Sequence, residues 1–529
     1  MRSAGLPLPS IPAKPQIPVV KPIQLPVKTA TRFQSVEAYS DGRNVWIKWQ
    51  MAVETQNFGF NVYAVTSSGR RKLNDAPILG GATRLANRPV FGGQYEFLAS
   101  SGKEANSQFV VETFPMSGSS VTSETFSPTR VSDLASLAGF SADRMLPKSS
   151  ATGKIEKTAL IPQSDLQSEM AQSLLSPDPD MQKWVAAQPG VKIGVRAEGI
   201  YRVTKAQLQT AGFDVSSDPT TWQLYLEGHE QAINVAANGD YVEFYGKGID
   251  TVESDTRIYY LLAGPSSGKR MAIRKAGPSL GPSASRSYSQ TFINKERTIY
   301  VNTVFNGDAE NYFGSVISGS AHTFNFNLSG IDQSTANAAM SIKLQGFSLT
   351  THPISVTLNG HVLSPMSGNL ATSFSADYTI PVAFLNEGSN ALILVSTATG
   401  SDISLFDQCS ISFNRTYLAK QNSLSFFTQN YKAAQLTGFT SANVRIFDTT
   451  FDGEAMMLTG LNFQNSGGTF GTRIPAYRGR VMYAVEDSAI QSPASLGINN
   501  PSTLSTPNHN ADLVIITYKD FKTQADAWA

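Results

Sequence analysis

The stretch ISVTLNGHVL, residues 354–363, decides the fold class of its part of the chain. It has the pattern of two short β-strands around a central Asn-Gly pair. Asn-Gly is strongly favoured in two-residue hairpin turns, because both turn positions adopt positive φ. Further strands are predicted at residues 391–395 and 409–413. We therefore expect a jelly-roll-like β-sandwich over residues 286–420.

A second β-rich domain is predicted upstream, over residues 191–285. It begins with the alternating run VKIGV, which is typical of a strand. A short helix over residues 205–211 should end at Gly212, because glycine tolerates the positive φ of a helix C-cap. Asn238-Gly239 predicts another hairpin turn.

A further β-sandwich is predicted over residues 30–130. Short strand-like runs recur there with turns between them, at residues 45–49, 60–65, 95–97 and 109–111. The run WIKWQMAVETQNFGFNVYAV resembles a fibronectin type III-like module of the kind found in bacterial secreted proteins. Trp49, Glu54 and the segment GFNVY carry this match.

Three segments are expected to connect these domains. Residues 1–29 contain seven prolines, which predict an extended, semi-rigid spacer, with a ligand for a proline-binding domain as the alternative. Residues 131–190 have patchy helical periodicity and Ser/Pro breaks, so we expect a loosely docked connector. Residues 421–510 are expected to form a bridging segment.

The last stretch, ADLVIITYKDFKTQADAWA, has a different pattern. Residues 513–516 form an unbroken apolar run that is too short for a helix and typical of a strand buried on both faces. Phe521, Ala525 and Trp528 follow at helical spacing. This predicts the opening strand and helix of an α/β domain over residues 511–529. A lone strand and helix cannot bury their apolar surface, so we expect the domain to continue downstream.

The composition gives no sign of a nucleic-acid partner. Lys and Arg number 42 and Asp and Glu 41, for a net charge of +1, whereas nucleic-acid binding favours a basic surface. Charged residues make up only 16% of the chain, below the roughly 25% typical of soluble domains. Ser, Thr, Asn and Gly take their place, as in secreted β-modules. No apolar run approaches the ~20 residues of a transmembrane segment.

The expected location is secreted or cell-surface. The first fifteen residues, MRSAGLPLPSIPAKP, lack the apolar segment of a signal peptide. Either the protein is cytoplasmic or its true N-terminus lies upstream of Met1. We favour the second interpretation.

Cys409 is the single cysteine of the chain and therefore the only candidate thiol nucleophile. It alternates with Ile411 and Phe413 along a predicted strand, which favours a buried core residue, because free cysteine behaves as a small hydrophobe. A catalytic role would need a His brought near it by the fold.

No metal site and no cofactor are predicted. The five histidines lack the i, i+4 spacing of a helical metal motif, and there is no Cys cluster; they are His229, His322, His352, His361 and His509. An acidic cluster could bind calcium through its oxygens or hold paired carboxylates for glycoside hydrolysis. Turns and a solvated face explain it as well; its members are Asp240, Glu243, Asp250, Glu253 and Asp255.

The stretch GPSSGKR, residues 264–270, superficially suggests a phosphate-binding loop. It is one residue short of that motif, ends in Arg where Ser or Thr is needed, and lies in a β-rich region with no helix after it. We interpret it as a hairpin turn.

Several stretches, in this order, resemble the N-terminal half of gingipain-type cysteine peptidases, a family that includes the sortase of the type IX secretion system. EGIYRVTKAQLQTAGFD and GDYVEFYGKGIDT are similar to the family's early β domain. ISVTLNGHVL, LNEGSNALILV and FDQCSISFNRTY are similar to its jelly roll. TGFTSANVRIFD and the last nineteen residues are similar to the lead-in and first strand of its caspase-like α/β domain. Together these stretches span roughly residues 190–529.

The resemblance implies the non-catalytic N-terminal region of a secreted gingipain-like cysteine peptidase. The family's His–Cys dyad lies downstream of the first strand of the peptidase domain, so no catalytic residue is assigned here and this chain is expected to be inactive. Its implied partners are a downstream peptidase domain and protein or peptide substrates. The alternative is a secreted adhesin or carbohydrate-binding multidomain β protein without catalysis.

Overall fold

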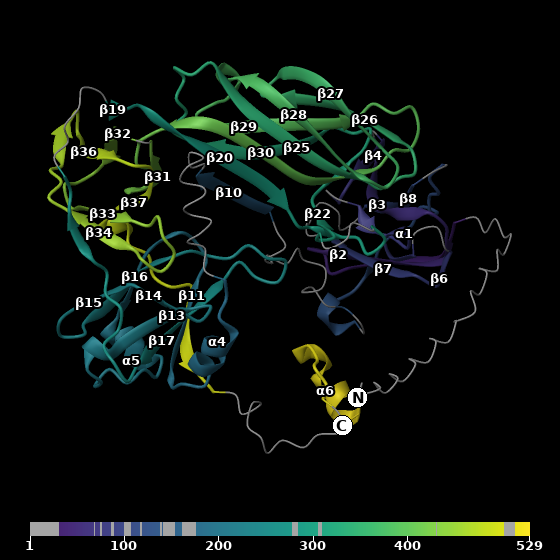
Figure 1. The fold of residues 1–529 in the computed structure, drawn as a ribbon. Helices are drawn as coiled ribbons and strands as arrows, with labels where there is room; N and C mark the ends of the chain where they lie inside the picture. The colour runs from purple at the N-terminus through teal and green to yellow at the C-terminus, as the bar shows by residue number, and fades with distance from the viewer. Residues whose placement is uncertain are drawn as a thin grey trace, which may run out of the picture. The chain divides into compact units, whose positions relative to one another are not determined.

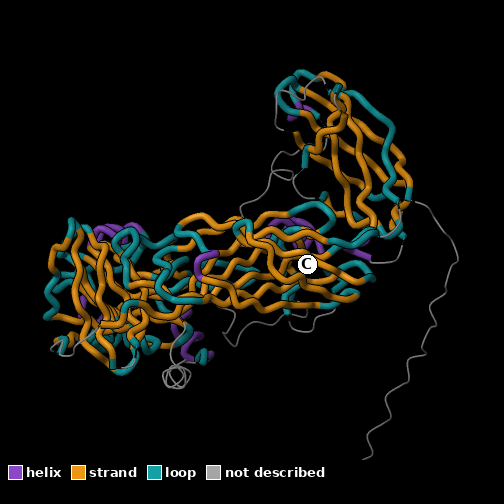
Figure 2. Tube along the Cα trace, turned by 90° about the horizontal axis from the view of Figure 1, so that it is seen from above, coloured by secondary structure: helices purple, strands orange, loops and turns teal. Residues whose placement is uncertain are grey.

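The structure is a computed structural model, and it confirms the predicted mainly β, multidomain architecture (Figures 1 and 2). It describes residues 31–67, 69–74, 77–85, 89–99, 107–116, 119–137, 140, 154–160, 176–277, 284–304, 309–429, 431–501 and 514–528. The proline-rich spacer expected over residues 1–29 and His509 lie outside this part. The chain divides into two compact units, residues 1–115 with 119–145, and residues 146–529 with 116–118.

The first unit contains two β-sheets around one apolar core. One sheet has the order β6, β2, β1, β9, with β7 also paired to β2, and in the other sheet β4, β5 and β8 all pair with β3. The described strands are β1 (Arg32–Ser40), β2 (Val45–Glu54), β3 (Asn57–Thr66), β4 (Gly69–Lys72), β5 (Ile78–Leu79), β6 (Val90–Phe91), β7 (Gln94–Ala99), β8 (Gln108–Pro115) and β9 (Thr129–Arg130). Short helical turns lie at α1 (Ala82–Leu85) and η2 (Leu134–Ser136).

The residues that carry the fibronectin type III-like match meet inside this unit. The rings of Trp49 and Phe60 lie 5.3 Å apart, and Trp49 stacks on Tyr95 at 5.8 Å. Glu54 is fully buried, and its carboxylate accepts hydrogen bonds from Tyr95 Oη at 2.5 Å and from the backbone N–H of Gly81 at 3.1 Å. The buried carboxylate is therefore solvated by protein donors, as a buried charge requires.

The second unit contains a β-rich body built from strands between residues 190 and 263 together with residues 495–499. A five-stranded sheet packs on a three-stranded sheet around the apolar cluster of Val191, Leu208, Trp222 and Phe244. The first sheet has the order β14 (His229–Gln231), β13 (Trp222–Leu226), β17 (Arg257–Ala263), β11 (Gly190–Val195), β38 (Ser495–Asn499). The second has the order β12 (Gly199–Thr204), β16 (Tyr241–Gly246), β15 (Ile233–Val235), and α4 (Pro179–Ala186), α5 (Lys205–Thr210) and η3 (Pro219–Thr221) flank the strands.

Both local signals predicted in this body are confirmed. Helix α5 begins with a capping box between Thr204 and Gln207, and Gly212 follows its C-cap with φ +87°. Strands β15 and β16 are antiparallel and joined through Asn238-Gly239, where Gly239 has φ +73°. These features form because the glycines adopt positive φ without a Cβ clash.

The jelly-roll-like sandwich packs two sheets face to face around a core rich in Ile, Leu and Phe. One sheet has the order β10 (Lys154–Leu160), β20 (Ser287–Glu296), β30 (Ser404–Thr416), β25 (Asn337–Gly346), β28 (Ser373–Pro381), with β23 (Val316–Ile317) also on β30. The other has the order β24 (His322–Leu328), β29 (Gly388–Ser396), β26 (Thr351–Leu358), β27 (His361–Asn369). Smaller elements are β21 (Ile299–Tyr300), β22 (Tyr312–Phe313) and η4 (Val382–Phe384). The predicted Asn359-Gly360 hairpin joins β26 to β27, and both turn residues have positive φ.

Residues 423–486 form most of a third sandwich, inside the stretch 421–510 where the sequence predicted only a bridging segment. Its two sheets enclose a separate core that includes Phe426, Leu436 and Ile474. One sheet has the order β18 (Ile273–Lys275), β34 (Met456–Thr459), β33 (Val444–Asp448), β37 (Arg480–Glu486), β31 (Ser423–Thr428). The other has the order β19 (Ala284–Ser285), β32 (Lys432–Phe439), β36 (Thr469–Tyr477), β35 (Gln464–Ser466), and η5 (Asp487–Ala489) follows β37. Two of these strands, β18 and β19, come from the preceding domain, so the sandwich is assembled from non-contiguous sequence.

Part of the expected connector is ordered within the second unit. Strand β10 adds to the jelly roll by antiparallel pairing with β20, and α4 begins with an Asp178 N-cap followed by Pro179. Short local patterns failed to reveal β10 because its hydrogen-bond partner lies more than one hundred residues away in the sequence.

The last described segment differs from the predicted strand and helix. Residues 514–518 are not in a strand, and Val514 and Ile516 are 73% and 95% exposed. The helical spacing is confirmed, because η6 (Lys519–Phe521) leads into α6 (Lys522–Trp528). A strand forms only by pairing with a neighbour, and within the described residues this segment has no paired strand.

Candidate functional site

A buried carboxylate joins the β-rich body to the third sandwich. Glu243 on β16 is 1% exposed and receives two arginines. Arg445 on β33 donates from Nη1 to Oε2 at 2.8 Å and from Nη2 to Oε1 at 3.1 Å, and Arg202 on β12 donates from Nε to Oε1 at 2.8 Å. Asn234 adds a hydrogen bond to Oε2 at 3.0 Å. We call Glu243, Arg202 and Arg445 the Glu243 clamp.

The electrostatics of the Glu243 clamp favour the ionised carboxylate. Burial alone would raise the pKa of Glu243, but the hydrogen bonds from Arg445 and Asn234 and the charge of Arg445 outweigh it and hold the pKa below its usual value. Arg445 also forms an ion pair with Asp487 at 2.9 Å. The two Nη groups of Arg445 bind the two oxygens of the Glu243 carboxylate, and such a bidentate pair has a fixed geometry. The clamp therefore fixes the orientation of β33 against β16.

A second polar contact lies beside the Glu243 clamp. Tyr245 Oη donates to Glu198 Oε1 at 2.5 Å, and Ser425 Oγ of β31 donates to the same oxygen at 2.9 Å. Burial raises the pKa of Tyr245 well above its usual value, so the phenol stays neutral and remains a donor. The β-rich body and the third sandwich are therefore held together by a row of polar contacts.

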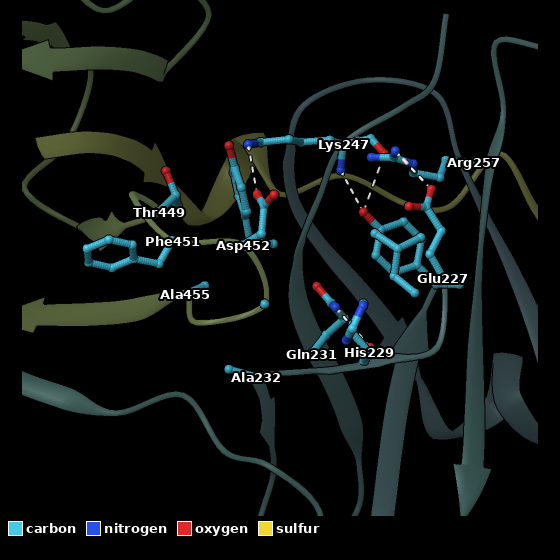
Figure 3. Close-up of a pocket in the computed structure, with 14 residues that line it drawn as sticks. Glu227, His229, Gln231, Ala232, Lys247, Arg257, Thr449, Phe451, Asp452 and Ala455 are labelled. Atoms are coloured by element: carbon cyan, nitrogen blue, oxygen red, sulfur yellow. Dashed lines mark hydrogen bonds and ion pairs between the residues drawn. The ribbon is translucent and has the colours of Figure 1, made fainter. Parts of the chain in front are cut away.

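A pocket of about 270 Å³ opens next to these contacts, between the β-rich body and the turn that follows β33 (Figure 3). Leu226, Ala232, Phe451 and Ala455 supply an apolar part of its lining. The polar residues include two oppositely charged pairs and His229; the pairs are Arg257 with Glu227, and Lys247 with Asp452.

The two charged pairs of this pocket differ in geometry. Arg257 Nη2 lies 2.9 Å from Glu227 Oε1, which is a hydrogen-bonded ion pair. Lys247 Nζ lies 3.9 Å from Asp452 Oδ1, which is too long for a hydrogen bond. The backbone N–H of Lys247 donates to Tyr259 Oη at 3.0 Å, and burial raises the pKa of Tyr259 to about 12.

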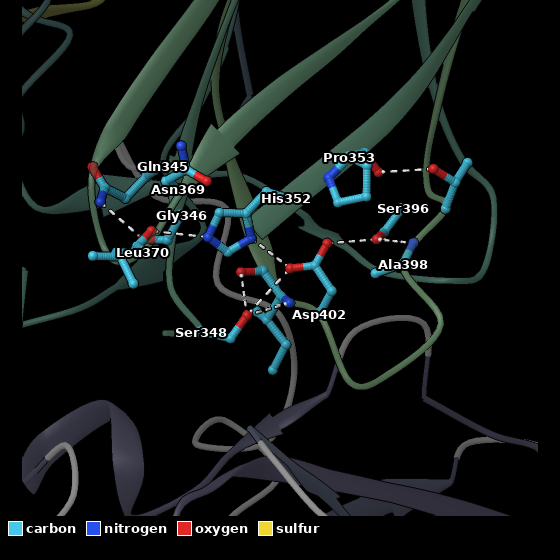
Figure 4. A network of polar contacts seen from close by, with 12 residues as sticks. Gln345, Gly346, Ser348, His352, Pro353, Asn369, Leu370, Ser396, Ala398 and Asp402 are labelled. Carbon is cyan, nitrogen blue, oxygen red and sulfur yellow. Dashed lines mark hydrogen bonds and ion pairs between the residues drawn. The ribbon is translucent and has the colours of Figure 1, made fainter. Parts of the chain in front are cut away.

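A Ser–His–Asp set lies at one end of the jelly roll (Figure 4). His352 Nδ1 lies 2.5 Å from Asp402 Oδ1, and His352 Nε2 donates to the carbonyl of Leu370 at 2.8 Å. Ser396 Oγ and Ser348 Oγ both donate to Asp402, at 2.5 Å and 3.2 Å. Neither serine is bonded to the imidazole, and both ring nitrogens are engaged, so this arrangement has no free base for nucleophilic catalysis.

The His352–Asp402 pair is a buried ion pair. The Leu370 carbonyl and the Asp402 carboxylate can only accept hydrogen bonds. The imidazole can donate to both only as the cation, in which both ring nitrogens carry a hydrogen. Burial lowers the pKa of His352, but the hydrogen bonds to Asp402 and Leu370 outweigh it and raise the pKa above its ordinary value. Burial raises the pKa of Asp402, but bonds from His352 and Ser396 lower it overall.

Cys409 is confirmed as a core residue. It is 1% exposed on β30, within the apolar core of the jelly roll. Burial raises the pKa of its thiol to about 12, so the thiolate is absent at neutral pH. The candidate nucleophile is chemically inert in this structure.

The other candidate histidines in the described residues each have a separate local partner. His229 Nε2 donates to the carbonyl of Ser176 at 2.7 Å, His322 packs on Phe324, and His361 stacks on Phe384 at 3.7 Å. Across the described part of the chain, no group of three or more His, Cys, Asp or Glu side chains is placed to hold a metal ion.

The predicted acidic cluster separates into individual contacts. Glu243 belongs to its clamp, Asp250 pairs with Lys157 and Arg297 at 2.6 Å each, and Asp255 pairs with Arg196 at 3.3 Å. Asp240 accepts a hydrogen bond from Asn238, and Glu253 lies in the loop before β17. Cations and turn donors therefore engage four of the five carboxylates that the calcium interpretation required.

The stretch at residues 264–270 is a loop between two sheets, and the interpretation as a hairpin turn is wrong. It runs from β17 to β18, which belong to different sheets. The backbone N–H of Gly268 donates to Thr220 O at 2.9 Å, and Lys269 N–H donates to Glu230 Oε1 at 2.6 Å. Arg270 donates to backbone carbonyls of residues 219–222. The backbone N–H groups that a phosphate-binding loop would offer to a phosphate are thus already hydrogen-bonded to acceptors within the protein.

Sequence reasoning missed the Glu243 clamp and the His352–Asp402 pair. Glu243 and Arg445 are 202 residues apart, and His352 and Asp402 are 50 apart. The available signal was a charged residue at an inward position of an apolar strand, as Glu243 is between Val242 and Phe244. That signal marks a buried charge but does not identify its partner.

Comparison with known proteins gives structural likenesses only. The sequence matches no protein-family model and no curated protein. Dimeric latent PorU from Porphyromonas gingivalis is similar over 60% of this chain and 34% of its own, with 15% identity and a TM-score of 0.48. This chain therefore spans about a third of the length of PorU.

Carbohydrate-binding modules are similar to a smaller part of the chain. The module CBM36, solved with calcium and xylotriose, matches over 26% of this chain and 92% of its own, with 11% identity and a TM-score of 0.16. A family 35 module from Clostridium thermocellum matches over 25% of this chain and 98% of its own, with 16% identity and a TM-score of 0.15. None of these likenesses assigns an activity or ligand to this chain. Among the described helices, none has the length and apolar character needed to cross a membrane.

Proposed function

We propose that this chain is the non-catalytic N-terminal region of a secreted gingipain-like cysteine peptidase. In this proposal the β domains carry and position a caspase-like peptidase domain whose His and Cys lie downstream of residue 529. The partners are that domain and the protein or peptide substrates that it cleaves. In this proposal no cofactor and no catalytic residue is assigned to residues 1–529.

The observation that carries the proposal is the Glu243 clamp. The three stretches EGIYRVTKAQLQTAGFD, GDYVEFYGKGIDT and TGFTSANVRIFD each resemble the family, and each supplies one member of the clamp: Arg202, Glu243 and Arg445. The three stretches are separate in the sequence and each resembles the same family, and in the structure all three meet at the buried carboxylate of Glu243. This supports the interpretation of residues 190–499 as one inherited assembly rather than a string of unrelated modules.

A second contact supports the same interpretation. Strand β38, which precedes the segment similar to the first strand of the peptidase domain, pairs antiparallel with β11 from Gly194 to Gly190. Asn499 Nδ2 donates to the carbonyls of Ala186 and Gln188 at 3.0 Å and 2.8 Å. The chain is therefore held firmly at residue 499, which is what a region that positions a following domain requires.

The buried thiol argues that catalysis has to come from elsewhere. A cysteine nucleophile needs a low pKa and access to substrate, whereas Cys409 has a pKa raised to about 12 and is enclosed in the jelly-roll core. We therefore expect residues 1–529 to show no thiol-dependent peptidase activity.

The deciding experiment is to read the coding sequence past residue 529 and to assay the full-length product. A His and then a Cys, each at the end of an apolar strand, together with thiol-dependent cleavage of peptides by the longer product, would support the proposal. The 1–529 chain serves as the inactive control. A reading frame that closes without such a pair would overturn it and favour the adhesin or carbohydrate-binding alternative.

A further inference from the structure

One wall of the pocket between the β-rich body and the third sandwich is held by a backbone hydrogen bond and an ion pair. The turn at residues 451–454 closes one side, and its Gly453 carbonyl accepts a hydrogen bond from the backbone N–H of Ala232 at 2.9 Å. Glu454 of the same turn forms an ion pair with Lys269. The pocket is therefore preformed, as small-molecule and peptide sites usually are.

Lys247 and Asp452 lie side by side in the lining of this pocket as a loose ion pair (Figure 3). Their charged atoms lie 3.9 Å apart, about 1 Å beyond a charge-assisted hydrogen bond. Lys247 Nζ also lies 5.4 Å from the centre of the Tyr245 ring. Among the described residues, neither charged group has a side-chain hydrogen bond. A ligand group that both accepts and donates would satisfy both.

The charge balance of the lining excludes a strongly charged ligand. The cations Lys247 and Arg257 are matched by the anions Asp452 and Glu227. An anion or a metal ion would add its own net charge to a lining whose charges already cancel. A neutral group with one acceptor and one donor fits this balance, and the peptide unit is such a group.

The remaining lining supplies a place for an apolar side chain. Leu226, Ala232 and Ala455 line the pocket with Phe451, a residue that is 36% exposed. A volume of about 270 Å³ accommodates one aliphatic side chain and an adjoining peptide unit. His229 is already committed to the Ser176 carbonyl, so it remains a neighbour rather than a free ligand group.

We propose that this pocket binds a polypeptide segment. One backbone carbonyl of the segment accepts from Lys247, the N–H of a neighbouring peptide unit donates to Asp452, and the intervening aliphatic side chain packs on Phe451. This inference goes beyond the proposed function, and it holds whether or not a peptidase domain follows the chain.

The test uses the capped tripeptide acetyl-Ala-Leu-Ala-amide and the intact 1–529 chain. Saturation-transfer NMR and titration should show binding with a dissociation constant on the order of 1 mM, as expected for so small a ligand. Lys247→Met and Asp452→Ala should each weaken binding about tenfold, because each removes a hydrogen bond to a charged group. Lys432→Met and Asp377→Ala remove exposed charges from other sheets and should leave binding unchanged.

Three outcomes would overturn the inference. They are absence of tripeptide binding, equal binding by all four variants, or binding of methyl glucoside at this pocket in place of the tripeptide. The third would make the pocket a carbohydrate site. The Asp452 side chain is 40% exposed and lies in a turn, so Asp452→Ala keeps the test valid if Lys247→Met lowers the melting temperature. Failure of this test leaves the peptidase proposal standing, since the latter rests on the downstream coding sequence.

Discussion

Glu243 shows how much one buried charge depends on its partners. Arg445→Met leaves the carboxylate 1% exposed with Arg202 and Asn234 only. Breaking a buried ion pair on one side costs about 3–5 kcal/mol, and we expect about 2–4 kcal/mol because Arg445 keeps some solvent contact. Urea unfolding followed by tryptophan fluorescence should show an earlier transition of the second unit.

Arg196→Met is the matched control for this variant. Arg196 pairs with Asp255 at 3.3 Å, and both side chains are more than half exposed, so the change should be nearly silent. Equal destabilisation by the two substitutions would mean that the Glu243 clamp contributes no more than a surface pair.

His352 predicts a pH dependence with a definite sign. Its pKa is raised in the folded state, so its stabilising contribution is complete below about pH 6.5 and is lost as pH rises through the folded pKa. The jelly roll should therefore melt at a lower temperature at pH 8.5 than at pH 5.5. Asp402, with a lowered pKa, loses its contribution only in acid, as pH falls through its folded pKa.

His352→Gln should flatten this pH dependence, and His361→Gln is the control. His361 is exposed and stacks on Phe384. Retention of the full pH dependence in His352→Gln would assign the effect to another group.

Cys409 should react slowly with thiol reagents in the native protein. Its burial and the pKa of about 12 leave almost no thiolate at pH 7. Labelling with an aromatic disulfide should be slow in buffer and fast in urea, and Cys409→Ala should cost on the order of 1 kcal/mol. Rapid native labelling, or thiol-dependent peptide cleavage that Cys409→Ala abolishes, would contradict the structural role.

At the scale of elements, the terminal segment should be separable from the sandwiches. Val514, Ile516 and Trp528 are mostly exposed, so little burial is lost when the segment is removed. Deleting residues 505–529 should leave the thermal transitions unchanged and reduce aggregation, because exposed apolar segments promote association. Calorimetry and light scattering would measure both. A loss of several kcal/mol would place the segment in the core of a sandwich.

The elements that could be predicted from the sequence are those with local causes. Asn359-Gly360, Asn238-Gly239 and Gly212 set turns or caps through their own backbone preferences, and all three appear where they were predicted. The third sandwich was missed because its sheets recruit β18 and β19 from residues before the jelly roll. The candidate pocket was missed for the same reason, since Lys247 and Asp452 meet only after two bodies pack.

At the scale of the whole molecule, the two compact units predict two autonomous folding domains. Residues 30–145 enclose a core of their own, with Trp49, Phe60 and Tyr95 at its centre. Expressed alone, this fragment should unfold cooperatively and give a dispersed NMR spectrum. Limited proteolysis of the intact chain should release a similar fragment by cleavage between residues 131 and 190. A molten fragment, or uniform resistance of that stretch, would contradict the division.

The pairing of β11 with β38 has a consequence for biosynthesis. Asn499 contacts Ala186 across 313 residues of sequence, so the first sheet of the second unit stays unfinished until residue 499 has been made. At roughly 5–20 residues per second, ribosomes would leave β11 with an open edge for tens of seconds. Such distant pairing also slows folding, because a long loop must close before its contacts form. Until β38 has been made, the exposed edge of β11 is a place where a holdase chaperone would bind.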